Sequence, residues 1–154
     1  MNQPKRILLG VCFAFFGLQS QAQESTNYLK EPDYTKPQLF ADLPLRMRVK
    51  IDDLSHYLKT ETGSSVAIQL ADGFLFEGTV ISKSDTKDQS VESIVVRSTN
   101  RPGAVLTFSR INTGKEIIYR GRILSKNNSD SMDIKEENGS YSLVKKSLYD
   151  SLNE

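Results

Sequence analysis

The amino-acid sequence predicts an all-β fold with one short helix, arranged as a small antiparallel β-barrel or sandwich of about eight strands. From Leu43 onward, short runs alternate apolar and polar residues, as strands with one buried face do. Turn-forming residues separate these runs at near-regular intervals. No strand–helix–strand repeats are present, which excludes a parallel sheet. The pattern does not separate barrel from sandwich, although Gly78 inside a strand favours a curled sheet.

The first elements are a strand and a helix. Apolar and polar residues alternate strictly through Leu43–Ile51, which predicts a strand with one buried face. The apolar face of this strand comprises Leu43, Leu45, Met47, Val49 and Ile51. Asp52 and Asp53 follow, and their carboxylates can accept hydrogen bonds from the first turn of a helix. We therefore expect a helix over residues 53–60, ended by Gly63.

The rest of the chain is predicted to form strands joined by turns. The expected strands are Val66–Leu70, Phe74–Ser82, Ser93–Ser98, Ala104–Ile111, Glu116–Leu124, Met132–Glu136 and Tyr141–Lys146. Asn138-Gly139 is a strong signal for a two-residue hairpin turn, and Gly78 indicates a bulge or bend. Residues 83–90 and Asn127–Ser131 are polar and predicted to be loops, and the tail Ser147–Glu154 to add a helical turn.

Residues 1–22 have the pattern of a cleavable signal peptide. Lys5 and Arg6 precede the uncharged apolar run Ile7–Leu18, and small residues at 20 and 22 place cleavage between Ala22 and Gln23. The apolar run is shorter than the ~20 residues that a membrane-spanning helix needs. We therefore expect a secreted or periplasmic protein that does not span the membrane after cleavage; the alternative is a retained anchor or a buried N-terminal helix.

Cys12 raises the separate question of a lipidated N-terminus. Val11 is bulky where a lipoprotein site has a small residue, and the apolar run continues past the cysteine. Cys12 is therefore expected to leave with the signal peptide.

Cleavage would leave a polar, flexible leader over 23–42 and a single β-rich domain over 43–150. The full chain has 20 basic and 19 acidic residues. Removal of Lys5 and Arg6 leaves 18 basic and 19 acidic residues, a formal net charge of −1. This balance argues against nucleic-acid binding, which favours a basic protein. Without cysteine the domain has no disulfide and no thiolate metal site, which fits a bacterial envelope or secreted protein.

Two basic stripes are the candidate binding residues. Arg46, Arg48 and Lys50 lie on one predicted strand, and Arg120 and Arg122 on another. If these strands pair, the stripes would merge into a face that attracts anionic partners. The alternative is an ordinary solvated strand face, on which basic residues also discourage edge-to-edge aggregation.

No catalytic or metal-binding constellation stands out, so we expect no enzyme and no cofactor. His56 is the only histidine and is expected on a solvated helix surface, which makes a zinc site improbable. Residues 127–133 carry oxygen ligands at alternating positions but lack the glycine and glutamate of an EF-hand, so a turn is preferred to a weak calcium site. The carboxylates available to a hydrolase are Glu77, Asp133 and Glu136, without a distinctive context.

Five segments follow in an order that suggests a family. They are Val66–Gly73, Phe76–Val80, Val105–Phe108, Tyr119–Ile123 and Gly139–Leu143. Their order resembles the propeptide-like N-terminal domain of secreted adamalysin-type zinc metallopeptidases, in which G-x-V, valine/serine-rich, G-x-I and Y-x-L strands follow one another. The resemblance covers residues 45–148, without a peptidase domain or zinc-binding helix after it. It implies a stand-alone, chaperone-like or inhibitory binding module.

The sequence therefore leads us to expect a non-catalytic exported β-domain that binds another protein, either a peptidase or an envelope component. The alternative is a small-ligand-binding β-barrel or a carboxylate-dependent hydrolase. A deep apolar cavity would favour the alternative, and a filled core with a broad surface site would favour protein binding.

Overall fold

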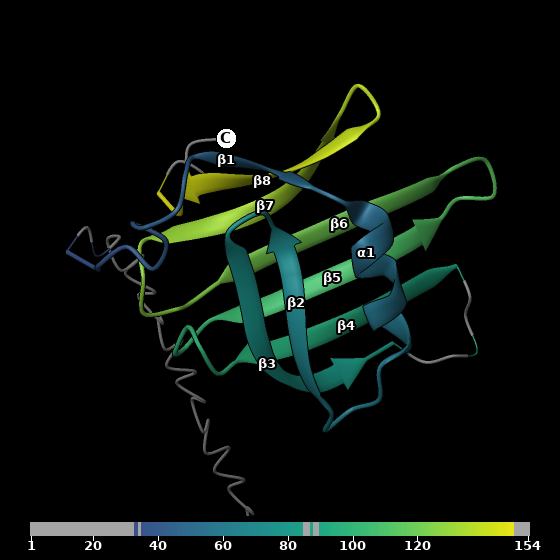
Figure 1. Cartoon of the computed structure of the whole chain (residues 1–154), viewed down its shortest axis with the longest axis horizontal. Coiled ribbons are helices and arrows are strands. Elements are labelled where there is room, and N and C mark those ends of the chain that lie inside the picture. Colours follow the sequence, from purple (N-terminus) through teal and green to yellow (C-terminus); the bar gives the residue numbers. More distant parts are fainter. Residues whose placement is uncertain (1–32, 34, 85–86, 88–89, 150–154) are drawn as a thin grey trace, which may run out of the picture. The chain divides into compact units, whose positions relative to one another are not determined.

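A computed structural model describes residues 33, 35–84, 87 and 90–149 of the chain (Figure 1). The predicted signal peptide with Cys12, the first part of the leader and residues 150–154 of the tail lie outside the described residues.

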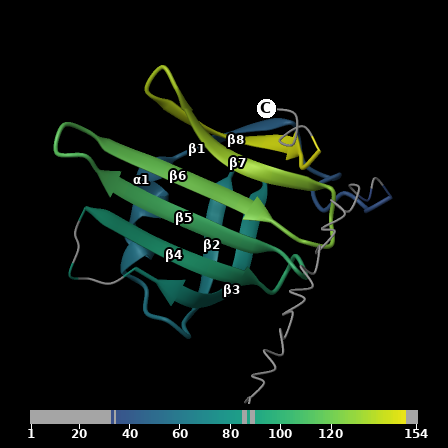
Figure 2. The same ribbon diagram turned by 180° about the vertical axis from the view of Figure 1, so that it is seen from behind.

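The described residues form eight antiparallel strands in one curled sheet, so the all-β prediction is confirmed. The strands are β1 (Arg46–Val49), β2 (Ser65–Ala71), β3 (Phe74–Lys83), β4 (Val91–Ser98), β5 (Val105–Asn112), β6 (Ile117–Leu124), β7 (Asp130–Glu137) and β8 (Ser140–Ser147). Their order is β1-β8-β7-β6-β5-β4-β3-β2, and this one sheet curls into a half-barrel (Figure 1, Figure 2).

The first strand is shorter than its alternating pattern predicts. β1 spans only Arg46–Val49, and Leu45, predicted to be buried, is 74% exposed although its carbonyl oxygen accepts the backbone N–H of Lys145 on β8 at 2.8 Å. Ile51 begins the helix α1 (Ile51–Ser55), which continues as a 3₁₀ turn, η1 (His56–Lys59). The predicted caps are wrong as well. Asp52 and Asp53 lie inside the first turn, and the N-cap residue Lys50 makes no side-chain capping bond.

The later strands match the predicted order, with differences at their ends. β7 begins at Asp130, inside the predicted loop, because Asp130 and Ser131 pair with the end of β8. This pairing extends β8 to Ser147, and the rest of the tail in which a helical turn was predicted lies mostly outside the described residues.

The predicted bend in β3 arises from close contact with β4. A Cβ added to Gly78 would lie 2.3 Å from the carbonyl oxygen of Arg97, so only glycine allows the two strands to pair this closely. The irregularity in strand register lies two residues later, between Val80 and Ser82. Ahead of the bend, the first residues of β3 lie beside β2 across the opening of the curl, and pairing with β4 begins only at Gly78 (Figure 1).

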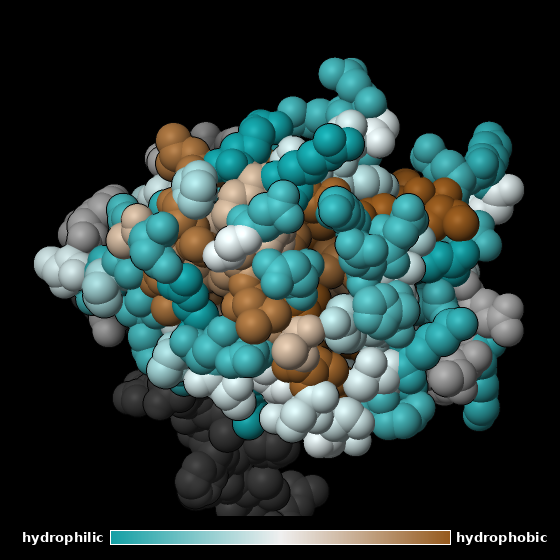
Figure 3. All heavy atoms as spheres, viewed as in Figure 1, coloured by the Kyte–Doolittle hydropathy of each residue, from teal (hydrophilic) through white to brown (hydrophobic). Residues whose placement is uncertain are grey.

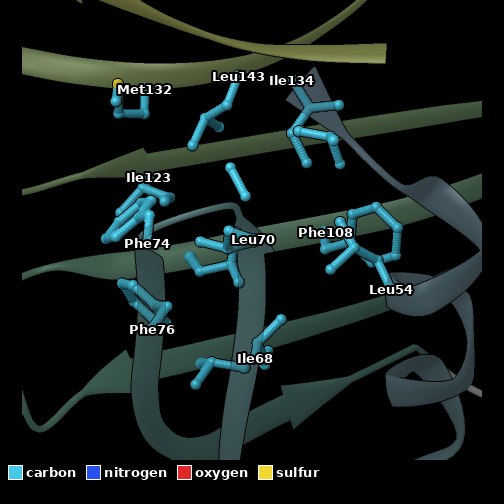
Figure 4. Close-up of a cluster of buried hydrophobic side chains, with 14 of the residues drawn as sticks. Leu54, Ile68, Leu70, Phe74, Phe76, Phe108, Ile123, Met132, Ile134 and Leu143 are labelled. Atoms are coloured by element: carbon cyan, nitrogen blue, oxygen red, sulfur yellow. The ribbon is translucent and has the colours of Figure 1, made fainter. Parts of the chain in front are cut away.

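The inside of the curl is filled with apolar side chains. Side chains from β2 and β3 meet those from β5, β6 and β7, among them Leu70, Phe108 and Ile123 (Figure 4). The void beneath the helix, lined by Leu54 and Tyr57 among others, is too small to hold a water molecule. On the face that carries α1, β2 and β3, apolar side chains gather in the middle and hydrophilic ones surround them (Figure 3).

The segment before β1 is part of this core. Phe40 is completely buried, and the buried carboxylate of Asp130 accepts the backbone N–H groups of Leu39 and Phe40 at 2.6 and 3.0 Å. Arg101 donates to both carboxylate oxygens of Asp42 at 2.7 and 2.6 Å. The described end of the predicted leader is therefore anchored to the sheet by hydrogen bonds and by a buried ring.

Candidate functional site

The two predicted basic stripes lie on different parts of the sheet. Arg46 and Arg48 belong to β1, with Lys50 directly before α1, whereas Arg120 and Arg122 belong to β6. β1 pairs with β8, and β6 pairs with β5 and β7, so two strands separate the stripes. The condition for a merged basic face, pairing of the two strands, is not met.

Ion pairs occupy part of each stripe. Arg46 donates to both carboxylate oxygens of Glu137 at 2.7 and 3.1 Å, which lowers the pKa of that carboxyl group. Arg122 makes the same two-point contact with Asp133 at 2.7 and 3.0 Å, and this hydrogen bonding raises the pKa of the guanidinium. The stripe cations without an ion-pair partner among the described side chains are Arg48, Lys50 and Arg120.

The sheet splits between the last two hairpins. β6 and β7 pair only between Gly121–Leu124 and Ser131–Ile134, although β6 begins at Ile117 and β7 continues to Glu137. Beyond the last paired position the β5–β6 and β7–β8 hairpins diverge (Figure 1, Figure 2). The hollow between them, which we call the hairpin cleft, has a volume of about 580 Å³. Its lining residues are Glu116, Ile117, Ile118, Tyr119, Arg120, Ile134, Lys135, Glu136, Gly139 and Tyr141.

Close packing marks the point where the split begins. A Cβ added to Gly121 would lie 2.6 Å from the Cδ1 atom and 3.1 Å from the Cγ1 atom of Ile134. The same Cβ would lie 3.4 Å from the Phe108 ring. Glycine therefore makes room for Ile134 at the last paired position of β6 and β7.

Backbone hydrogen-bonding groups face the cleft from both sides. The N–H of Tyr119 donates to the hydroxyl of Tyr141 at 3.4 Å, so it points away from β5. Because these groups alternate between the two neighbours of a strand, Ile117 directs its own into the cleft as well. On β7 the alternation from the last paired residue, Ile134, assigns Glu136 to the cleft. Each wall of the cleft is thus a short, unpaired strand edge.

Aromatic rings form the inner side of the cleft. Tyr119 stacks on Phe108 with a centroid distance of 6.0 Å, and it meets Tyr141 edge to face at 5.9 Å. Ile117, at the mouth, is 47% exposed, the most exposed of the large apolar side chains on the described strands. The Glu136 carboxylate accepts the backbone N–H of Gly139 at 2.6 Å, which holds the hairpin turn.

A second, smaller hollow of about 290 Å³ adjoins the cleft on the convex face of the sheet. It is lined by Thr107, Ser109, Arg120, Gly121, Arg122, Asp133, Ile134 and Lys135. Arg120, Ile134 and Lys135 line both hollows, so the two form one continuous site.

The other candidate residues are not brought together. His56 is exposed on η1, and its ring lies 4.0 Å from that of Tyr57. Asp133 and Glu136 are three positions apart on β7 and therefore face opposite sides of the sheet, and Glu77 lies on β3.

In the segment 127–133, for which a turn was preferred to a weak calcium site, Asp130 is held by two backbone N–H groups and Asp133 by Arg122. Within the described ranges, no group of three or more His, Cys, Asp or Glu side chains is placed to hold a metal ion. Nor does any helix there have the length and apolar character needed to cross a membrane.

The sequence had indicated Arg120 and Arg122 but not Ile117, Tyr119 or Tyr141. The available signal was Gly121 in the middle of a strand, together with the run Ile117–Tyr119 just before Arg120, in which three large nonpolar or aromatic residues depart from strict alternation. Searches with protein-family models, against curated proteins and against solved structures each found no match.

Proposed function

We propose that this chain is an exported, non-catalytic binding module that receives an extended segment of a partner protein in the hairpin cleft. The partner class that we propose is another exported protein, either a peptidase or an envelope component. The signal-peptide pattern of residues 1–22 supports action outside the cytoplasm, in the periplasm or the medium.

The observation that carries the proposal is the unpaired edge of β6. Strand edges attract other strands, and proteins commonly recognise extended peptides by adding them to such an edge. The N–H of Ile117 faces an open hollow rather than a neighbouring strand, and that of Tyr119 makes only a long bond of 3.4 Å to the Tyr141 hydroxyl. The side chains beside them, an exposed isoleucine and two tyrosines, offer the apolar and aromatic contacts that anchor protein interfaces.

The filled interior also supports this function over the small-ligand alternative. A barrel that stores a ligand needs an internal cavity of several hundred Å³. The void beneath the helix has no water-accessible volume, and completely buried side chains such as Phe76, Ile123 and Leu143 occupy the inside of the curl. The larger hollow space lies between the hairpins, on the surface.

Affinity capture with matched variants tests the proposal. The purified protein is immobilised and exposed to envelope and secreted fractions, in parallel with Ile117→Lys and Leu75→Lys. Both positions carry exposed apolar side chains, 47% and 41%, but only Ile117 lines the cleft. We expect a protein that the original chain and Leu75→Lys capture and that Ile117→Lys loses. Capture of nothing, or equal capture by all three, would contradict the proposal.

A further inference from the structure

We infer that the partner segment carries an acidic side chain, bound on the convex face by Arg120 and Lys135, between apolar residues that face Tyr119 and Tyr141. This inference rests on the proposed function and assigns the chemistry of the segment that the cleft receives.

The charges of the convex hollow leave two cations without a counterion. Its charged side chains are Arg120, Arg122, Asp133 and Lys135. Arg122 contacts both oxygens of Asp133, whose side chain is only 9% exposed, so this pair is already neutral. No ion pair joins Arg120 or Lys135 to another described side chain. The convex hollow taken by itself therefore has a surplus of two positive charges, and one of them, Lys135, also interacts electrostatically with Glu137.

Hydroxyl groups complete a set of donors that suits a carboxylate. Thr107 and Ser109 on β5 lie directly opposite Arg122 and Arg120 on β6 and line the same hollow. A carboxylate accepts several hydrogen bonds at once, and those from charged donors are the stronger ones. A hollow of about 290 Å³ has room for one acidic side chain.

The side chains of an added strand alternate between the two faces of the sheet, and this alternation determines the sequence pattern expected of the partner segment. Neighbouring side chains of a strand point to opposite faces of the sheet. On a strand added beside β6, one side chain would face the convex hollow and its two neighbours would face Tyr119 and Tyr141. The predicted recognition pattern is therefore apolar–acidic–apolar.

Acidic groups in the cleft argue for a peptide over a polyanion. Glu116 and Glu136 line the cleft on either side of the surplus cations. A sulfated polysaccharide would bring negative charge against both of them, and like charges repel. A single carboxylate flanked by uncharged residues avoids this repulsion.

The test uses immobilised peptides of about nine residues, the length of a long strand. Each peptide alternates threonine and valine, with Glu, Gln or Lys at a central position flanked by valines. The purified protein is labelled and applied at low and high salt. We expect the Glu peptide to bind about 5-fold more tightly than the Gln peptide at low salt, with the preference shrinking at high salt.

Substitutions test whether Arg120 and Lys135 cause the preference for the Glu peptide over the Gln peptide. Arg120→Gln and Lys135→Gln should each reduce the preference for Glu to about 2-fold or less. Arg48→Gln removes an arginine that also lacks an ion-pair partner among the described side chains. Arg48 lies on β1, which two strands separate from β6, so this variant should leave the preference unchanged.

The outcomes separate the inference from the proposed function. Binding of all peptides without a preference for Glu would overturn the inference and leave the proposed function standing. Binding of heparin through Arg120 without peptide binding would overturn the inference in favour of a polyanion. Failure to bind any peptide, together with capture that is indifferent to Ile117→Lys, would overturn both.

Discussion

Replacing Phe40 by alanine tests whether the segment before β1 belongs to the folded core. The ring is completely buried, meets Phe74 edge to face at a centroid distance of 6.2 Å, and lies 5.7 Å below the guanidinium carbon of Arg101. Truncating a buried phenylalanine costs about 3–5 kcal/mol, because the lost burial and the remaining cavity both destabilise. We expect a loss of stability in this range, because the ring is completely buried and its whole surface contributes to the loss.

Thermal and urea denaturation followed by circular dichroism would measure the loss. For a domain of this size, Phe40→Ala should lower the Tm by roughly 10–20 °C. Leu45→Ala is the matched control, because Leu45 is five positions away and 74% exposed, and its effect should stay within about 0.5 kcal/mol. If Phe40→Ala lowered the free energy of unfolding by less than about 1 kcal/mol, this segment would not be part of the core, because truncating a buried phenylalanine costs far more.

Three further predictions concern the same scaffold. Asp130→Asn replaces a buried acceptor of two N–H groups with a side chain that has only one acceptor oxygen, and should cost about 1–3 kcal/mol in urea denaturation. The hydrogen bond from Arg101 lowers the pKa of Asp42 below its ordinary 3.8, so the pair stabilises the fold above that pH and stops doing so as the pH falls through the lowered pKa. Asp42→Asn should therefore destabilise slightly near neutral pH and not in strong acid; equal losses in both would contradict the pairing. Gly78→Ala places a Cβ 2.3 Å from a β4 carbonyl oxygen and should lower stability by about 1–3 kcal/mol, whereas an unchanged Tm would contradict the close strand contact.

The strands were predictable because their signals are local. Alternation and turn residues act within a few positions of the chain, so Asn138-Gly139 marked its hairpin correctly. The same local pattern failed at Leu45, because the alternation starts before β1 and says nothing of whether other elements cover a given side chain.

The core role of Phe40 and the cleft depend on long-range contacts. Asp130 accepts the N–H of Leu39 from 91 positions away, and no local pattern announces such a bond. The cleft exists because β6 and β7 stop pairing at Gly121 while each keeps its own hairpin partner. Sequence patterns identify strands but do not tell where two of them part.

Hydrogen exchange in the cleft tests most directly the claim that a partner segment adds to β6. The purified protein is measured alone and with the protein that affinity capture recovers, and exchange is followed at single amides. The account predicts that the partner slows exchange at Ile117 and Tyr119, whose N–H groups face the cleft. Protection confined to β1, with exchange at Ile117 and Tyr119 unchanged, would contradict it.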